Sequence, residues 1–362
     1  MATAMPDLAD PNPCPAVRGR LAPSPTGYLH LGNAWSFLLA WLACRSAGGT
    51  LVLRMEDLDP ERSRPAFAAA IMEDLRWLGL DWDEGPDKEK ARSMESYFQS
   101  ARHAFYQGAL RRLEEDGAVY PCYCTRKELR SLAGAPHPTR ESPFGDSGAA
   151  YPGTCRFLSG EERRMREQEG RRACLRLRCP EHPVAFQDAV YGPHSFSPAQ
   201  WGGDFALQRS DGVIAYQLAV VVDDGLMGIS QVVRGADLLS STPRQLLLFD
   251  LLGFPRPSYA HIPLICDAEG FRLAKRHASL SLRSLREQGV PPENILGFLA
   301  WKAGLRERPE TARPQELAHD LAGRRTAWGA DADQIFPPKL GASARLLLGP
   351  DPLAELCAVT AR

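Results

Sequence analysis

A stiff turn near the start of the chain places a histidine and a glycine directly before an apolar segment. Residues 20–33 read RLAPSPTGYLHLGN, in which His30 and Gly32 close the turn. Where a strand feeds a helix through such a turn, anions bind to free backbone N–H groups and the positive end of the helix dipole. His30 can donate to a phosphate oxygen, and Gly32 lets a base or ribose lie against bare backbone. The pattern indicates phosphate binding, and the alternative is an ordinary turn whose histidine caps the helix.

A group of cysteines with a tyrosine forms a second candidate site. Cys122 and Cys124 lie in CYC, and Tyr151 and Cys155 follow in YPGTC after a loop. Two close-spaced pairs can share one zinc ion, as thiolates do in structural zinc sites. A single C-x-C is a weaker signal than two C-x-x-C pairs, so buried thiols on opposite faces of a strand remain an alternative. His137, within the loop, is an alternative fourth ligand.

The turn must be held between two strands for its backbone to face a ligand. Residues 19–24 and 49–57 have the apolar runs of short buried strands, and 33–48 has the pattern of a helix ending in glycines. These segments predict a β-α-β unit. Further strands are expected at 204–210, 231–237 and 258–265, and helices at 64–80, 93–117, 160–172 and 242–254. Alternating strands and helices predict an α/β fold with a mostly parallel, helix-covered sheet.

Composition sets limits on the partners and the compartment. The chain has 362 residues, 44% hydrophobic and 24% charged, and a formal net charge of −1. Nucleic acid would therefore have to meet a local basic face. The N-terminus lacks the features of a secretory signal, and the longest apolar stretch is about half of a membrane span. We expect a cytoplasmic protein without a membrane partner, whose Cys14, Cys174 and Cys179 are reduced thiols outside the metal site.

Four stretches, in order, resemble the signatures of class I aminoacyl-tRNA synthetases of the glutamyl branch. The turn at 20–33 is similar to the first signature, and 53–65, LRMEDLDPERSRP, to the R-x-E-D-x-D-P stretch of that family. Residues 213–245 are similar to its amino-acid pocket, and RLAKR at 272–276 stands where the second signature, K-M-S-K-S, belongs. The resemblance implies a Rossmann-type class I synthetase catalytic domain with a zinc-bearing insertion and a short helical C-terminal region.

The same resemblance implies roles for individual residues. Glu56 would face the α-ammonium group of glutamate, and Tyr216 with Arg234 would complete recognition of the amino acid. Without the resemblance, the ordinary interpretation is that Glu56 caps a turn, Tyr216 is a core aromatic and Arg234 forms a surface ion pair. The expected glutamate-binding residues are Arg20, Ala22, Pro23, Ser24, Glu56, Tyr216 and Arg234; the ATP-binding residues are His30, Gly32, Asn33 and Lys275; the zinc ligands are Cys122, Cys124, Tyr151 and Cys155.

The implied reaction needs no enzyme nucleophile. The glutamate carboxylate would attack the α-phosphorus of ATP, supplied with Mg²⁺, while His30 and Lys275 act as catalytic residues that stabilise the developing charge. In the second signature Arg272 replaces the first lysine and Ala274 the serine, whereas Lys275 is retained. We expect these changes to slow activation rather than abolish it.

The length of the C-terminal region suggests a particular branch of the family. Fewer than about 90 residues follow Lys275, too few for the large anticodon-binding region of discriminating glutamyl-tRNA synthetases. This organisation and YPGTCR resemble the stand-alone glutamyl-queuosine tRNA(Asp) synthetases, which activate glutamate without tRNA and transfer it to queuosine in the anticodon of tRNA(Asp). The expected partners are glutamate, ATP and that tRNA, with the chain as a monomer. The alternatives are a shortened glutamyl-tRNA synthetase charging tRNA(Glu), or an inactive paralogue that binds glutamate, ATP or RNA.

Changes of pattern divide the chain into five regions. They are a disordered tail at 1–19, the first half of the catalytic domain at 20–118, an inserted zinc-binding, acceptor-like module with a flexible loop at 119–184, the second half of the catalytic domain at 185–260, and the signature loop with helical C-terminal region at 261–362.

Overall fold

The structure is a computed structural model, and it describes most of the chain. The described residues are 17–88, 96–125, 127–129, 151–197, 202–271, 273, 280–327, 336–337, 340–341, 343 and 345–359. Several predictions concern residues outside these ranges: most of the tail, the loop at 133–150 with His137, and Arg272, Ala274 and Lys275 of the second signature.

The predicted β-α-β unit is present. Strands β1 (Arg18–Leu21) and β2 (Thr50–Leu53) pair in parallel, with Arg20 opposite Val52, and helix α1 (Leu31–Arg45) connects them. β1 begins two residues before the expected catalytic domain. α1 is buried on almost every side because β1 and strand β8 (Gln231–Gly235) lie against it on one side and helix α10 (Pro314–Ala327) on another. The unit therefore fixes the turn at the head of α1 within the core.

The sheet continues from β1 as the alternating pattern predicts. Strand β8 (Gln231–Gly235) lies beside β1, where the Ser230 N–H donates to the Arg18 carbonyl at 3.0 Å. Parallel pairing then joins β8 to β9 (Ser258–Ile262) and β9 to β5 (Val184–Asp188), and β6 (Gly192–Phe196) pairs antiparallel at the edge. The pair β2-β1 and the four-stranded sheet β8-β9-β5-β6 lie side by side, so the strands follow the order β2-β1-β8-β9-β5-β6.

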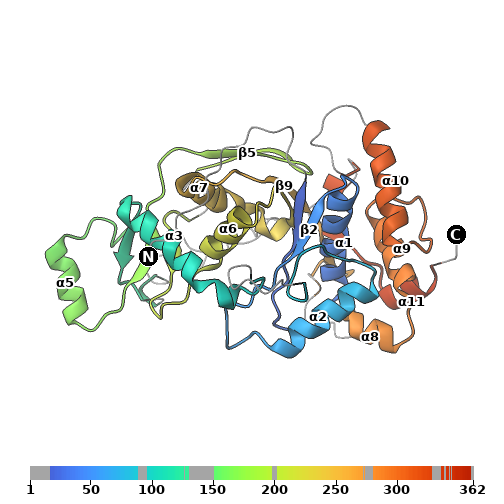
Figure 1. The fold of residues 1–362 in the computed structure, drawn as a ribbon, viewed down its shortest axis with the longest axis horizontal. Helices are drawn as coiled ribbons and strands as arrows, with labels where there is room; N and C mark the ends of the chain where they lie inside the picture. The colour runs from blue at the N-terminus through green and yellow to red at the C-terminus, as the bar shows by residue number, and fades with distance from the viewer. Residues whose placement is uncertain are drawn as a thin grey trace.

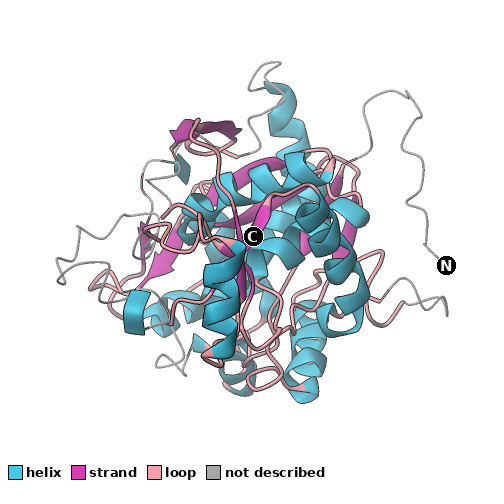
Figure 2. Cartoon of the chain, turned by 90° about the vertical axis from the view of Figure 1, so that its left-hand side faces the viewer, coloured by secondary structure: helices cyan, strands magenta, loops and turns pink. Residues whose placement is uncertain are grey.

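Helices cover both faces of these strands. Helices α3, α6 and α7 pack together on one side, while α1 lies on the other with α9 and α10 outside it (Figure 1). In Figure 2 helices lie around the central strands, whereas further strands stand at the left-hand edge of the molecule. The bounds are α2 (Pro65–Trp77), the 3₁₀ helix η1 (Gln99–Arg102), α3 (His103–Glu115), α6 (Tyr216–Leu226), the 3₁₀ helix η3 (Ala236–Ser241) and α7 (Thr242–Leu252).

The helix expected at 93–117 begins later than predicted. Tyr97 and Phe98 are extended, because the Met55 N–H donates to the Tyr97 carbonyl at 2.8 Å and the Gln99 N–H to the Met55 carbonyl at 3.0 Å. Pairing with the segment after β2 therefore overrides the local helical pattern, as tertiary contacts often do.

The inserted module is a small antiparallel sheet with one exposed helix, at the left-hand end of the molecule in Figure 1. Helix α5 has no buried residue, and Ser159 caps it through a capping box with Glu162. The chain leaves the module after β4, forms β5 and β6 of the central sheet, and returns as β7. The third strand thus comes from beyond the expected range 119–184. The elements are β3 (Val119–Cys122), α5 (Gly160–Gln168), β4 (Cys174–Leu177) and β7 (Ala206–Gln208).

The C-terminal region is mostly helical, with one difference from expectation. A short strand, β11 (Arg345–Leu347), pairs in parallel with β10 (Leu264–Cys266), and periodicity cannot reveal a strand of three residues. Within the described residues, no helix combines the length and apolar character that crossing a membrane requires. The helices are α8 (Leu282–Glu287), α9 (Pro292–Lys302), α10 (Pro314–Ala327) and α11 (Pro352–Cys357).

Candidate active site

The turn between β1 and α1 holds its histidine in one orientation. The His30 Nδ1 accepts from the Gly32 N–H at 3.1 Å, and the Asn33 side chain accepts from the His30 N–H at 3.0 Å. The capping geometry offered as the alternative is therefore present. Because Nδ1 is an acceptor, the proton of the neutral ring lies on Nε2, which can donate to an anion. Capping and phosphate binding are compatible uses of the same histidine.

A pocket lies between the start of α1, the end of β8 and the start of β10, and three of the four predicted nucleotide-binding residues line it. Leu273, from the second signature, lies in its wall, while Lys275 is outside the described residues. A Cβ at Gly32 would lie 3.1 Å from the His30 ring, so a larger residue would crowd it. The pocket is lined by His30, Gly32, Asn33, Trp35, Ser36, Gly235, Asp237, Leu238, Leu264, Ile265 and Leu273.

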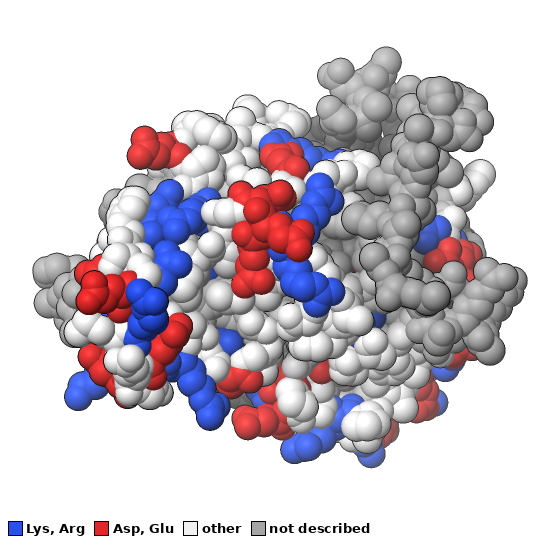
Figure 3. All heavy atoms as spheres, turned by 60° about the vertical axis from the view of Figure 1, so that its left-hand side comes forward, with Lys and Arg blue, Asp and Glu red and all other residues white. Residues whose placement is uncertain are grey.

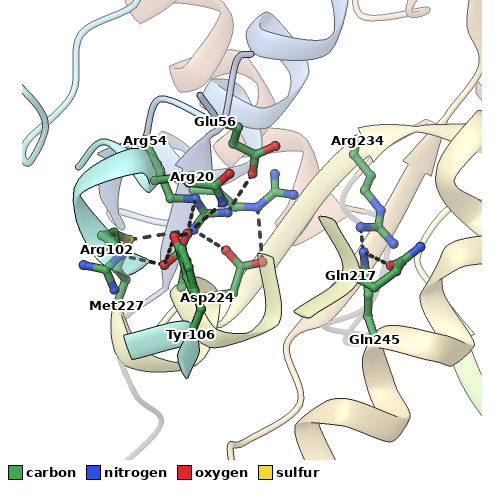
Figure 4. A network of polar contacts seen from close by, with 12 residues as sticks. Arg20, Arg54, Glu56, Arg102, Tyr106, Gln217, Asp224, Met227, Arg234 and Gln245 are labelled. Carbon is green, nitrogen blue, oxygen red and sulfur yellow. Dashed lines mark hydrogen bonds and ion pairs between the residues drawn. The ribbon is translucent and has the colours of Figure 1, made fainter. Parts of the chain in front are cut away.

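A fully buried arginine, Arg54, organises the acidic side of the neighbouring site. Its guanidinium lies 3.1 Å from Glu56, 2.7 Å from Asp224 and 3.6 Å from Asp223 (Figure 4). Burial raises the pKa of the Glu56 carboxyl, and the charges of Arg54 and Arg20 oppose that effect. Arg54 is thus compensated by carboxylates of the protein itself, and it holds Glu56 in place.

Arg20 is buried but only weakly paired. Its Nε lies 3.7 Å from an Asp224 oxygen and has no hydrogen-bond partner, while Nη1 donates to the Val233 carbonyl at 3.3 Å. The segment that follows approaches Glu56, because the Glu56 N–H donates to the Pro23 carbonyl at 2.9 Å. Pro23 is buried, Ala22 half-buried and Ser24 exposed. The Arg20 guanidinium therefore retains capacity for an external carboxylate.

Arg234 is a buried cation whose hydrogen-bond partners are all neutral. Its Nε donates to His261 Nε2 at 3.0 Å, Nη1 to the Gln245 side chain at 2.6 Å and Nη2 to the Thr242 hydroxyl at 2.8 Å. The guanidinium carbon lies 4.9 Å from the centre of the Tyr259 ring. Among the described residues, no carboxylate oxygen lies within 4.0 Å of this guanidinium.

The surroundings of Arg234 favour an anion from outside the chain. A buried charge without a counter-ion is costly, and Arg54 shows how the protein pairs a structural one. Burial raises the pKa of the Tyr216 hydroxyl, with Glu56 adding to the effect and Arg234 and Arg20 opposing it. These four predicted glutamate-binding side chains therefore share one electrostatic neighbourhood, and the site offers two cations, one anion and one hydroxyl.

Several residues that build the site were not predicted from the sequence. For some of them the sequence does hold a signal, a charged residue inside an apolar stretch. Arg54 lies in LVLRMED, and Asp223 and Asp224 lie in LAVVVDDGL. No comparable signal marks the glutamine chain, in which Gln245 Nε2 donates to Gln217 Oε1 at 2.9 Å. The residues are Arg54, Asp188, Gln217, Asp223, Asp224, Gln245 and His261.

The cysteines of the second candidate site converge. The Sγ atoms of Cys122, Cys124 and Cys155 all lie within 4.8 Å of one another. The Tyr151 hydroxyl lies 3.3 Å from Cys122 Sγ and accepts from the Cys155 N–H at 2.9 Å. Strand β3 ends at Cys122, so Cys124 is free to approach the same point instead of facing away. Cys174, opposite Cys122 on β4, is not part of this group.

Comparisons with known proteins show the family of the chain. Residues 16–316 match the family model of class I tRNA synthetases (E and Q), catalytic domain. The chain is 62% identical over 289 residues to a protein named Glutamyl-Q tRNA(Asp) synthetase from Nitratidesulfovibrio vulgaris, covering 80% of this chain and 87% of that protein. A protein of the same name from Symbiobacterium thermophilum is 53% identical over 306 residues, with coverage of 84% and 92%.

The fold is also similar to a solved structure. A glutamate tRNA ligase from Elizabethkingia meningosepticum, in complex with its amino acid, superimposes with a TM-score of 0.71 at 27% sequence identity. The match covers 91% of this chain and 67% of that one.

Proposed function

The chain belongs to the class I tRNA synthetases of the glutamate and glutamine type, and we infer that it activates glutamate with ATP and transfers it to queuosine in the anticodon of tRNA(Asp). The observation that carries the choice of substrate is Arg234, a buried cation with only neutral partners, in one electrostatic neighbourhood with Arg20 and Glu56. An acidic amino acid supplies two carboxylates for the arginines and an ammonium group for Glu56.

In the first step, an α-carboxylate oxygen of glutamate attacks the α-phosphorus of ATP. The new P–O bond forms glutamyl-adenylate, and the bond to the bridging oxygen breaks as pyrophosphate leaves with the electron pair. The imidazole of His30 and the positive end of the α1 helix dipole would stabilise the phosphate oxygens, and Mg²⁺ accompanies the nucleotide as part of the substrate. Lys275 supplies charge for the departing pyrophosphate. The protein contributes position and charge rather than a nucleophile.

In the second step, a hydroxyl of the queuosine ring attacks the carbonyl carbon of glutamyl-adenylate. AMP leaves, and the product is an ester on the modified base. The face of the molecule in Figure 3 carries interspersed basic and acidic side chains rather than a field of one sign. Because a net charge of −1 gives no long-range attraction, we expect the tRNA to be held by local contacts around the site.

Cys122, Cys124, Tyr151 and Cys155 would hold one structural zinc ion in the inserted module. Three thiol sulfurs and one phenol oxygen make four donors, the number that zinc prefers; the three sulfurs lie within 4.8 Å of one another, and the phenol oxygen lies 3.3 Å from Cys122 Sγ. A bound ion would tie the end of β3 to the segment 151–155 and stabilise a module that has little apolar core of its own.

ATP–pyrophosphate exchange tests this function. We expect exchange with glutamate in the absence of tRNA, and none with aspartate or glutamine, because only glutamate matches both carboxylate sites. An inactive paralogue would show no exchange. A shortened glutamyl-tRNA synthetase would charge tRNA(Glu) instead of tRNA(Asp), but the identities of 62% and 53% are to proteins named for tRNA(Asp).

A further inference from the structure

An aspartate and a histidine lie directly behind Arg234 on neighbouring strands. His261 of β9 is opposite Arg234 of β8 in the sheet register, and Asp188 ends β5 on the other side of β9. The side chains of Asp188 and His261 are completely buried, and their Oδ2 and Nδ1 atoms lie 2.6 Å apart. Asp188 is itself held by the backbone N–H groups of Val190, Tyr191 and His261, at 3.0, 2.9 and 3.0 Å.

The hydrogen bonds determine which histidine nitrogen carries the proton. The Asp188 carboxylate only accepts, so the proton lies on His261 Nδ1. Nε2 then carries no proton and is an acceptor. It receives the Arg234 Nε–H at 3.0 Å, a group that is always protonated, and the Thr242 hydroxyl lies 3.1 Å from it. Burial lowers the pKa of His261 to about 4, with the charge of Arg234 contributing and Asp188 opposing, so the ring is neutral near pH 7.

A neutral acceptor at this position has a specific consequence. A carboxylate bonded to Arg234 Nε would orient the guanidinium but would also neutralise it and weaken its attraction for a substrate carboxylate. The imidazole orients the same nitrogen without adding a negative charge in contact with it. Asp188 lies on the opposite side of the imidazole ring from Arg234, and its hydrogen bond with Nδ1 fixes the tautomer of His261.

We propose that Asp188 and His261 are positioning residues that aim Arg234 at a substrate carboxylate while leaving its charge uncompensated. The proposal rests on the proposed function, because it needs Arg234 to bind glutamate. Its distinguishing consequence is that disturbing His261 weakens glutamate binding without weakening ATP binding.

The test compares two polar substitutions of His261 by exchange kinetics. His261→Asn can still donate to Asp188 but is too short to accept from Arg234, whereas His261→Gln places an acceptor near the position of Nε2. We expect H261N to raise the KM for glutamate at least about tenfold, the effect of losing one hydrogen bond to a charged group. The KM for ATP should stay within about twofold in both variants, and H261Q should recover most of the glutamate affinity.

A double-mutant experiment distinguishes the orientation of Arg234 from a general disturbance of the structure. In an Arg234→Lys background the Nε–H donor is absent, so adding His261→Asn should change the glutamate KM by less than about twofold. His194→Gln is the matched control, because His194 lies on β6 of the same sheet, where its ring stacks on Phe196 and contacts Phe186 at a tilt. We expect it to leave both KM values unchanged.

The outcomes are separable. Wild-type protein without glutamate-dependent exchange would overturn the proposed function. With active wild type, an unchanged glutamate KM in H261N would overturn the positioning role. Glutamate and ATP KM values rising together, without recovery in H261Q, would also overturn it, because that pattern is expected of a merely structural residue.

Discussion

At the scale of single residues, three buried arginines near one sheet edge differ in how their charge is met. Among the described residues, Arg54 contacts Glu56, Asp223 and Asp224, Arg20 has one carboxylate at 3.7 Å, and Arg234 has neutral partners only. Because a protein pairs charges that serve stability, this series separates a structural arginine from two that are suited to a ligand.

Arg234→Ala should abolish or severely weaken glutamate activation. Removing one partner of a buried charge pair costs enough to raise the KM for glutamate about 30-fold or more. The melting temperature without substrate should fall little, because no carboxylate of the described protein loses its counter-ion. Exchange kinetics and thermal melts measure the two effects, and unchanged glutamate kinetics would contradict the assignment.

Arg54→Met should lower stability much more than Arg234→Ala. The change leaves Asp223 and Asp224 buried beside a neutral side chain and should lower the free energy of unfolding by about 3–5 kcal/mol. Arg102 still pairs with Asp223 at 2.6 Å and limits the loss. Denaturant unfolding of R54M and R234A, side by side, gives the comparison; equal losses of stability would mean that the two arginines are not distinguished by their partners.

The buried His261 predicts a pH dependence of stability. Burial lowers its pKa to about 4 from an ordinary value of about 6.5, so the unfolded chain binds this proton more readily than the folded one. The stability associated with the neutral ring is full above pH 6.5 and is lost as the pH falls toward 4. Wild type should therefore lose more stability than H261Q between pH 7 and 4.5 in thermal melts. Parallel curves would show that His261 does not titrate in this range.

Some residues of the candidate site could be predicted from the sequence and others could not, for a physical reason. Arg20, Glu56 and Arg234 stand in stretches whose resemblance to a family assigns them, and the structure places them in one electrostatic neighbourhood. Asp188 and His261 come from strands that are remote in sequence, and only the sheet register brings them together. Spacing along the chain contains no information about such pairs.

At the scale of elements, apolar periodicity and glycine positions predict the strands and helices that local interactions stabilise. The β-α-β unit and helix α7 lie where apolar periodicity and glycine stops indicate. Pairing between segments decides the exceptions: residues 97–98 are extended against Met55, and β7 returns to the inserted module after two strands of the central sheet. These arrangements depend on long-range contacts that no window of sequence contains.

We predict that the inserted module binds one zinc ion per chain. Cys122→Ser should remove the metal and lower the melting temperature, because the module loses a thiolate from a four-donor site. Cys174→Ser, on the facing strand but outside the cysteine group, should retain the metal and serves as control. Metal analysis after dialysis checks both variants. A metal-free wild type would contradict the assignment.

At the scale of the whole molecule, the inserted module and the helical C-terminal region lie at opposite ends of the catalytic body (Figure 1). Arg20 and Arg234 lie on the neighbouring strands β1 and β8, and Gly235, which follows Arg234 directly, lines the pocket at the start of α1. With glutamate and ATP bound as we propose, the attacking carboxylate and the α-phosphorus would meet there without a covalent enzyme intermediate. The same arrangement leaves the adenylate to be attacked by a tRNA hydroxyl.

The most direct measurement is transfer of labelled glutamate to tRNA(Asp) that lacks its terminal adenosine. Without that nucleotide no 3′ ester can form, whereas queuosine in the anticodon is intact. The account predicts that this truncated tRNA accepts glutamate when it carries queuosine and does not when it carries guanosine there. Labelling that requires the terminal adenosine, or that occurs on tRNA(Glu) instead, would contradict it.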